Sequence, residues 1–282
     1  MTMAEAMRVV EAPVAHVWSD EGDDLHLFCG DGPGGLAALG IVDAVITDPP
    51  YAVFNQPDIA KLKSLKTGHE GHLRRNAEWE LESPMAYRAL MRRLLTASAS
   101  RVMNGWVHVF CADRWLSHLA SMGGRCGLKY RLPFVWCKTN PPPRIRSRQW
   151  RAATELAAVF SCGTATMDRC PPNYFECPFE PGQTRWHETQ KPGAVLDHLI
   201  EHYTKPGDLV VDPFAGSGST LMACRRLKRR CVAIELDPKR CAMIRAAMVD
   251  GPRAARAMAA QAGIVGRPQE ADGQLTMGMD DV

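Results

Sequence analysis

The chain has 282 residues, of which 46% are hydrophobic, so it can bury one sizeable core, and we expect one domain. Its net charge of +3 is too small to indicate nucleic-acid binding over the whole surface, so any basic binding surface must be local. No apolar run approaches the ~18 residues that span a bilayer, and no secretory signal precedes the ten scattered cysteines. These features predict a soluble, cytoplasmic protein with reduced thiols.

The N-terminal part predicts a β-α-β start. Residues 1–20 have no clear period and are expected to be loose. Residues 25–29 alternate as in a strand, which ends at the Gly-Asp-Gly of residues 30–32. A short helical stretch at 36–39 then precedes a β-branched, apolar run at 42–47. This run has the composition of a buried strand in an α/β sheet.

Residues 48–51 follow that strand and have an unusual combination of groups. Asp48 is an acceptor, Pro49 and Pro50 leave backbone carbonyls with few competing N–H donors, and Tyr51 adds a flat face. Two acceptors beside an aromatic ring suit the exocyclic amino group of a nucleobase. The tetrapeptide therefore predicts a site for alkylating an amino nitrogen, and the alternative is a proline-rich turn that merely ends the strand.

The middle of the chain predicts further sheet elements. Residues 52–82 are polar and read as either a lid or a disordered insert. Ser83 and Pro84 provide a cap and a first turn for a helix. Strands are expected at three places and a helix between the first two, with the last two strands forming an antiparallel hairpin; the strands are 106–111, 132–137 and 155–160, and the helix is 114–121.

A basic and aromatic segment at 138–151 joins the last two of these strands. It is the most concentrated such patch in the chain and suits phosphates and stacked bases. The residues that we assign to DNA contact are Arg144, Arg146, Arg148, Trp150 and Arg151. The alternative is a solvated basic loop. No C-x-x-C pair supports a zinc set among the later cysteines, so no metal site is expected.

A second strand-turn-helix unit begins after Lys191 and Pro192, which open a helix. A buried strand ends at Asp212, and a turn containing Gly216 and Gly218 then leads into a helix. Such a turn places bare N–H groups and a helix N-terminus against a ligand. The acid disfavours a phosphate and suits an ammonium group, such as that of a methionine moiety.

The next strand, at 231–235, ends at Glu235. A carboxylate in this position can accept hydrogen bonds from both ribose hydroxyls of an adenosine. A plain βαβ unit would explain the apolar pattern, but it would not explain the two glycines between two strand-ending acids. This half of the chain therefore predicts a site for a cofactor that has an amino-acid end and an adenosine end.

The two motifs together resemble those of the amino-group DNA methyltransferases, which transfer methyl from S-adenosylmethionine to adenine N6 or cytosine N4. Asp-Pro-Pro-Tyr at 48–51 comes first and Asp-Pro-Phe-Ala-Gly-Ser-Gly at 212–218 follows, as in the circularly permuted beta class. Residues 187–192 are similar to the family's His-Pro-Thr-Gln-Lys-Pro, with Glu188 in place of proline, and Gly-Asp at 30–31 is similar to its Gly-Asp. The resemblance implies a Rossmann-like, doubly wound, mostly parallel α/β sheet with loop insertions for DNA recognition.

The resemblance also implies roles for individual residues. Asp48, Pro49, Pro50 and Tyr51 would serve the target base. The cofactor residues would be Asp212, Phe214, Gly216 and Gly218 at the methionine end, Glu235 at the ribose, Asp31 at the adenine amino group, and Lys191 and Pro192 flanking the pocket. By position, the target-recognition segment is 138–186, with 52–82 as a second contributor.

The expected function is site-specific methylation of double-stranded DNA, with adenine N6 favoured over cytosine N4 because the family tends to pair Asp-Pro-Pro-Tyr with adenine. A catalytically inactive nucleic-acid-binding protein is a more distant alternative. A homodimer and a cognate restriction endonuclease stay open as further partners. The expected organisation is a loose segment 1–20, a catalytic half 21–137, recognition loops plus one sheet strand 138–186, a cofactor half 187–250 and a mostly loose tail 251–282.

Overall fold

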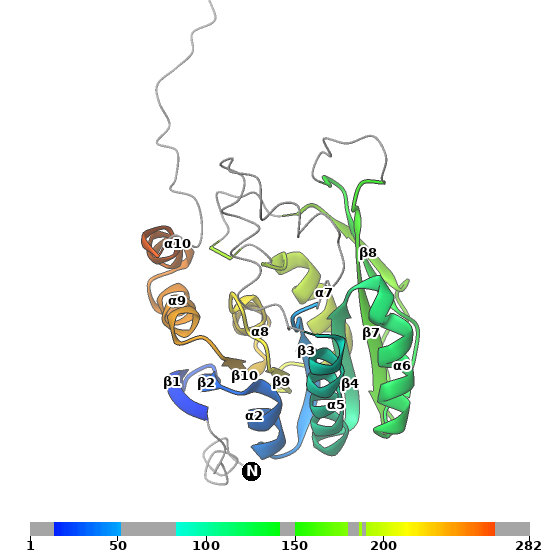
Figure 1. Cartoon of the computed structure of the whole chain (residues 1–282). Helices are drawn as coiled ribbons and strands as arrows, with labels where there is room; N and C mark the ends of the chain where they lie inside the picture. Colours follow the sequence, from blue (N-terminus) through cyan, green and yellow to red (C-terminus); the bar gives the residue numbers. More distant parts are fainter. Residues whose placement is uncertain (1–13, 52–82, 142–149, 180–185, 188–189, 263–282) are drawn as a thin grey trace, which may run out of the picture.

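The computed structural model describes residues 14–51, 83–141, 150–179, 186–187 and 190–262. The described residues form one mixed sheet of ten strands, with helices packed against it (Figure 1). The strand order is β1-β2-β10-β9-β3-β4-β7-β6-β8, with β5 beside β7. The strands are β1 Val14–Asp20, β2 Leu25–Gly30, β3 Val42–Thr47, β4 Val102–Cys111, β5 Lys129–Tyr130, β6 Phe134–Lys138, β7 Thr154–Cys162, β8 Tyr174–Cys177, β9 Leu209–Asp212 and β10 Arg230–Glu235.

The centre of the sheet is parallel. Strands β2, β10, β9, β3 and β4 all run in one direction, whereas β1 pairs antiparallel with β2 and β7 pairs antiparallel with β4. The predicted hairpin is confirmed, because β6 pairs antiparallel with β7. From β9 the chain continues to β10 on one side, and from β3 it continues to β4 on the other. The boundary between β9 and β3 is therefore the switch point at which ligands bind in open α/β sheets.

Helices cover both faces of the sheet (Figure 1). They are α2 Gly32–Ala38, α5 Pro84–Arg101, the 3-10 turn η1 Asp113–Trp115, α6 Leu116–Arg125, α7 Gly193–Tyr203, α8 Ser219–Leu227, α9 Pro238–Val249 and α10 Pro252–Gln261. The side chains of α2, α5 and α6 form one core with the sheet, and those of α7, α8 and α9 form a second core on the opposite face.

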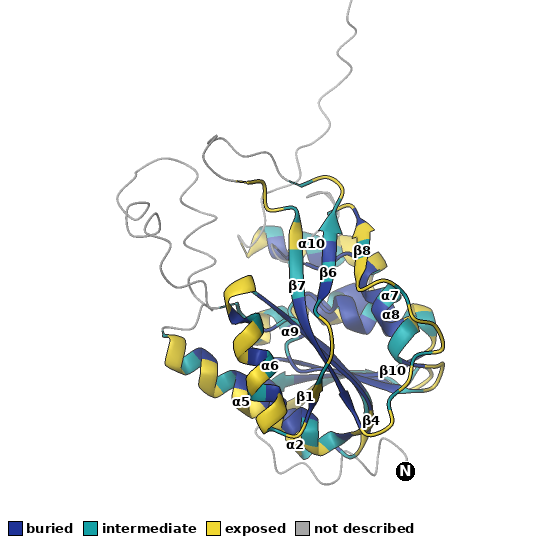
Figure 2. Ribbon diagram, turned by 90° about the vertical axis from the view of Figure 1, so that its right-hand side faces the viewer, coloured by how far each residue is buried: buried dark blue, intermediate teal, exposed yellow. Residues whose placement is uncertain are grey.

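Side chains that alternate along the strands pack into the two cores in turn. Val45 and Val107 belong to the first core, while their neighbours Ile46 and Trp106 belong to the second. Figure 2 shows the resulting arrangement, with buried strands inside and the exposed residues of α5 and α6 on the outside. The predicted doubly wound α/β architecture is thus confirmed.

Three helices begin with the same local device. Asp31, Ser83 and Asp237 each accept a backbone N–H of the first turn, and a proline follows in the first two helical positions. The cap at Ser83 agrees with the sequence prediction. The cap at Asp31 adds a structural role to a residue that was assigned only to the cofactor.

The structure corrects the prediction of loose ends in two places. Residues 14–20 form β1, which pairs with β2, and residues 252–261 form α10, which packs on α9. The helix α10 was missed because its buried face consists of small residues, including Ala255 and Ala259, which give little apolar periodicity.

All ten cysteines lie in the described part of the chain, and none of them forms a disulfide bond there. Among the described residues, no helix is long and apolar enough to cross a membrane.

Strand β4 passes very close to β3 at Gly105. A Cβ atom added there would lie 1.8 Å from the backbone oxygen of Asp43. We therefore expect Gly105→Ala to lower the free energy of unfolding by roughly 1–3 kcal/mol, the usual cost of overpacking. Gly124 in α6 is the matched control, because a Cβ there would meet nothing within 4 Å. Urea unfolding should leave Gly124→Ala as stable as the wild type or slightly more stable, and equal losses in both variants would contradict the steric argument.

Candidate active site

The parallel pairing of β3 with β9 brings the two sequence motifs together. Ala44 lies opposite Val210 and Val45 opposite Val211, so the tetrapeptide and the glycine turn leave the same edge of the sheet side by side. A cavity of about 630 Å³ lies there. The predicted site residues in its wall are Asp31, Asp48, Pro49, Pro50, Tyr51, Lys191, Asp212, Phe214, Gly216 and Glu235. Two others, Pro192 and Gly218, do not line it.

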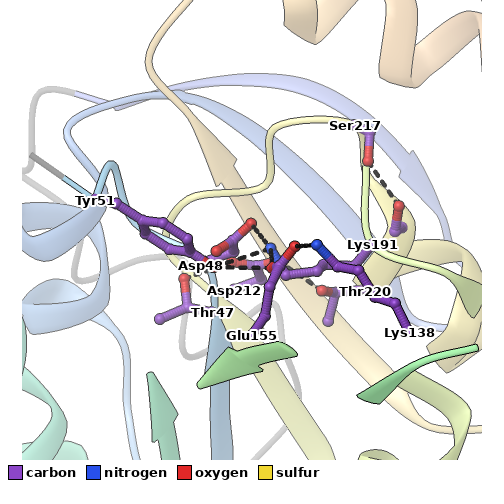
Figure 3. Close-up of polar contacts among 10 residues, drawn as sticks. Thr47, Asp48, Tyr51, Lys138, Glu155, Lys191, Asp212, Ser217 and Thr220 are labelled. Carbon is purple, nitrogen blue, oxygen red and sulfur yellow. Dashed lines mark hydrogen bonds and ion pairs between the residues drawn. The ribbon is translucent and has the colours of Figure 1, made fainter. Parts of the chain in front are cut away.

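Asp48 presents one engaged and one free carboxylate oxygen. Its Oδ2 accepts a hydrogen bond from Lys191 Nζ (Figure 3). Its Oδ1 is buried and has no hydrogen-bond partner in the described part of the chain. Burial, together with the nearby carboxylate of Glu155, raises the pKa of Asp48 against the opposing effect of Lys191. A buried acceptor without a partner is costly, so this oxygen is suited to a donor supplied by a ligand.

Lys191 is the centre of a cluster that the sequence did not reveal. Its ammonium also donates to Tyr51 OH at 3.2 Å and lies 3.1 Å from Glu155 Oε2. Lys138 Nζ contacts the other oxygen of Glu155 at 2.7 Å. Burial opposes the charge on Lys191, but the two carboxylates outweigh it and raise the pKa of the ammonium. Burial likewise opposes ionisation of Glu155, and the two lysines overcome it, lowering its pKa to about 2.

Asp212, the last residue of β9, is held by donors from three places. Thr47 Oγ1 donates to Oδ1 at 2.7 Å, Thr220 Oγ1 donates to Oδ2 at 2.6 Å, and the backbone N–H of Phe214 also reaches Oδ1. Burial raises the pKa of Asp212 to about 6, although these three hydrogen bonds oppose the shift. Sequence analysis missed Thr47 and Thr220, whose positions directly before the tetrapeptide and just after the glycine turn were the available signal.

The glycine turn needs its glycines for two different reasons. Gly216 and Gly218 have φ values of +53° and +73°, which disfavour other residues. A Cβ at Gly218 would also lie 2.7 Å from Ile244 Cγ2. Glu235, at the end of β10, accepts the N–H of Gly216 at 2.8 Å and that of Asp237 at 3.0 Å. The carboxylate therefore fixes the turn, and it also faces the cavity.

Asp31 lies in the cavity wall with its carboxylate already engaged. It caps α2 and forms an ion pair with Arg93. The adjacent Gly32 approaches the cofactor turn closely, since an added Cβ would lie 1.9 Å from the backbone oxygen of Pro213. The Gly-Asp-Gly segment is thus packed directly against the turn after β9.

The predicted DNA-contacting residues are only partly covered by the structure. Arg144, Arg146 and Arg148 lie outside the described residues, as does the segment 52–82. Trp150 is 95% exposed, and Arg151 donates to the backbone carbonyl of Pro141. The assignment of this segment to DNA therefore stays a prediction.

Residues 42–246 match the model of the DNA methylase family of N6 and N4 amino-methyltransferases. The chain belongs to this family. One relative, named "Putative methylase YubD" in Escherichia coli (strain K12), is 30% identical over 198 residues, covering 69% of this chain and 76% of its own. The Type II methyltransferase M2.DpnII of Streptococcus pneumoniae is 24% identical over 234 residues, covering 70% of this chain and 78% of its own.

Two solved methyltransferase structures have the same fold. The complex of M1.HpyAVI with S-adenosylmethionine (SAM) is 25% identical, with a TM-score of 0.58, and covers 80% of this chain and 99% of its own. The cytosine-N4-specific PvuII DNA methyltransferase is 18% identical, with a TM-score of 0.64, and covers 85% of this chain and 93% of its own. The Rossmann-like methyltransferase fold implied by the sequence is therefore confirmed.

This DNA amino-methyltransferase uses S-adenosylmethionine as its cofactor. The cavity wall fits that molecule chemically. Asp212 and Glu235 are buried carboxylates whose hydrogen-bond donors are hydroxyl or backbone N–H groups, so both retain acceptor capacity. The glycine turn between them has no side chains at Gly216 and Gly218 that would block close approach.

The raised pKa of Asp212 makes a prediction about the cofactor-free protein. An acid whose pKa is raised to about 6 on folding binds more protons in the native state than in the unfolded state. Stability is then lost as pH rises from about 4 to about 6. We expect cofactor-free Asp212→Asn to be more stable than the wild type at pH 7.5, by roughly 2 kcal/mol.

The same difference should shrink at pH 5, because the wild-type carboxyl is then largely protonated. Urea unfolding of both proteins at the two pH values measures it, and comparison at equal pH cancels the groups that titrate alike in both. A gap that widens towards pH 5 would show that Asp212 is stabilised in its ionised form.

Proposed function

We propose that the protein methylates adenine N6 in double-stranded DNA at a specific sequence. The observation that carries the proposal is the free Oδ1 of Asp48, a buried acceptor in the wall of the same cavity as the cofactor turn. Pro49 and Tyr51 stand beside it, and Pro49 offers a carbonyl without an N–H of its own. Two acceptors next to an aromatic face suit a planar base that carries an amino group.

The bound cofactor supplies an electrophilic methyl group on a sulfonium. The chain's own residues make the target nitrogen a better nucleophile. Asp48 Oδ1 accepts one N–H of the target amino group and the Pro49 carbonyl accepts the other, which favours a pyramidal nitrogen with an available lone pair. As the nitrogen gains positive charge, the interaction with the Asp48 carboxylate strengthens, so it stabilises the transition state more than the ground state.

The base must leave the double helix to reach this position, because its amino group is otherwise paired. Tyr51 provides a face on which the flipped base can stack. Its hydroxyl is fixed at the same time, since it donates to Glu155 at 3.3 Å and accepts from Lys191. The ring is therefore positioned before any base arrives.

Adenine is favoured over cytosine by the tetrapeptide itself, which begins with Asp rather than Ser. Cytosine N4 is the second candidate, and a cytosine-N4-specific methyltransferase shares the fold. Both amino groups require the same two acceptors. Methylation-sensitive sequencing of DNA from a host that expresses the protein reports the modified base together with its context, and methylation found only on cytosine would overturn the adenine proposal.

The cofactor is proposed to lie with its methionine end at Asp212, Phe214 and the glycine turn and with its ribose at Glu235. Asp31 would meet the adenine of the cofactor while it keeps its cap on α2. The relative named as a Type II methyltransferase supports a role beside a cognate restriction endonuclease.

Replacement of Asp48 tests the catalytic step. Asp48→Ala removes the acceptor of the amino group, and we expect single-turnover transfer of labelled methyl to duplex DNA to slow by about 10²-fold or more. Cofactor affinity, measured by calorimetry, should change little. If the Asp48→Ala variant keeps the wild-type transfer rate, the tetrapeptide is only a turn. If the wild-type protein binds SAM and DNA but transfers no methyl, the alternative of a catalytically inactive nucleic-acid-binding protein is supported instead.

The basic segment is tested by salt dependence. The four arginines predicted to contact phosphates are Arg144, Arg146, Arg148 and Arg151. If they do so, neutralising any one should make the fall of log affinity with log salt shallower by about one unit of slope. A residue that instead reads a guanine edge should relax specificity at one base pair by about 1–3 kcal/mol. Arg125, at the end of α6, is a control outside the segment. Wild-type DNA affinity at every salt concentration in all four variants would exclude a role in DNA binding.

A further inference from the structure

Glu155 contacts the tetrapeptide residue Tyr51, the buried Lys191 and the half-buried Lys138, although its position at the start of β7 gave no sign of a function. Its Oε2 contacts Lys191 at 3.1 Å and accepts from Tyr51 OH at 3.3 Å. Its Oε1 contacts Lys138 at 2.7 Å. Figure 3 shows Glu155 together with these partners. Each oxygen of Glu155 thus has a cationic partner.

These contacts occupy all three N–H bonds of the Lys191 ammonium group. An ammonium group has three N–H bonds, and the structure gives Lys191 three acceptors: Asp48 Oδ2, Glu155 Oε2 and Tyr51 OH. Its side chain is only 7% exposed, so water has little access to it. Lys191 therefore engages one Asp48 oxygen and is held away from the other.

The consequence for Asp48 follows from the charges. Asp48 and Glu155 are two carboxylates facing two ammonium groups, those of Lys191 and Lys138. Without the charge of Glu155, Asp48 would be the only carboxylate in this cluster. Lys191 would then be drawn further towards Asp48, into the space that the target amino group needs.

We propose that Glu155 is a positioning residue for methyl transfer: it holds Lys191 so that Oδ2 of Asp48 is engaged and Oδ1 stays free for the amino group of the target base. This inference rests on the proposed role of Asp48 as the acceptor of that group. Glu155 touches neither base nor cofactor in this scheme, and it acts through Lys191.

The first test is the charge of Glu155. Glu155→Gln keeps the size of the side chain and an acceptor oxygen, and we expect it to slow single-turnover methyl transfer at saturating DNA and cofactor by at least about tenfold. Cofactor affinity by calorimetry should stay within about twofold, because Glu155 is remote in sequence and contact from the cofactor turn. Glu155→Asp retains the charge and should recover part of the rate. Glu21→Gln is the matched control, since Glu21 is exposed in the turn between β1 and β2, at the opposite edge of the sheet from the cavity, and this variant should transfer methyl at the wild-type rate.

The second test asks whether Glu155 acts through Lys191. In a Lys191→Met background the lysine is no longer present to be held, so adding Glu155→Gln should change the transfer rate by less than about twofold. A purely structural role of Glu155 would give the same loss in both backgrounds. The labelled-methyl assay is sensitive enough to measure slow transfer by Lys191→Met and by the double variant. If Lys191→Met does not fold, Lys191→Gln replaces it.

The outcomes separate this inference from the proposed function. If Asp48→Ala transfers methyl at the wild-type rate, the proposed role of Asp48 is wrong, and the inference about Glu155 falls with it. If Asp48→Ala is slow while Glu155→Gln keeps the wild-type rate, the role of Glu155 is wrong and that of Asp48 stands. Equal losses from Glu155→Gln with and without Lys191 would also overturn the inference.

Discussion

The hydrogen bond from Thr47 to Asp212 joins the ends of two strands that come from opposite halves of the chain. Thr47 ends β3 and leads into the catalytic tetrapeptide, while Asp212 ends β9 and leads into the cofactor turn. The register of β3 against β9 sets this meeting, with Val45 opposite Val211. Because side chains alternate along a strand, a slip of one residue would turn Thr47 away from Asp212. The adjacency of the tetrapeptide and the glycine turn depends on that register.

Buried charge is treated differently in the two halves of the site. Asp48 and Glu155 are matched by Lys191 and Lys138, and this pairing offsets the cost of removing four charges from water. Asp212 has only neutral donors, and its pKa is accordingly raised. In the proposed binding mode, Asp212 would gain its counter-charge from the positively charged methionine end of the cofactor. The site is thus built at some expense to the stability of the cofactor-free protein, a common cost of function.

Local sequence was enough to predict what local chemistry controls. The strand leading into Asp48, the glycine turn after Asp212 and the cap at Ser83 each depend on a few adjacent residues, and the structure places strand, turn and cap there. Glu155 could not be found in this way, because its partners come from β6, the segment after β3 and the segment before α7, and ion pairs across segments leave no periodic signal. Thr47 was missed because its partner, Asp212, comes from the other half of the chain. The helix α10 was missed for a different reason, namely that alanines bury a face without an apolar stripe.

The position of the charge cluster also relates recognition to catalysis. Lys138 ends β6 and Glu155 lies at the start of β7, so the pair brackets residues 139–154, which include the arginines predicted to contact DNA. The two strands are paired up to this point, and Lys138 N donates to the carbonyl of Ala153 at 2.7 Å. Sites carried by rigid elements are held more precisely than sites on loops. One hairpin therefore anchors the ends of the segment predicted to contact DNA and, through Glu155 and Lys191, the carboxylate proposed to receive the base. Under this proposal, DNA bound by the segment and the flipped base would share a single frame of reference.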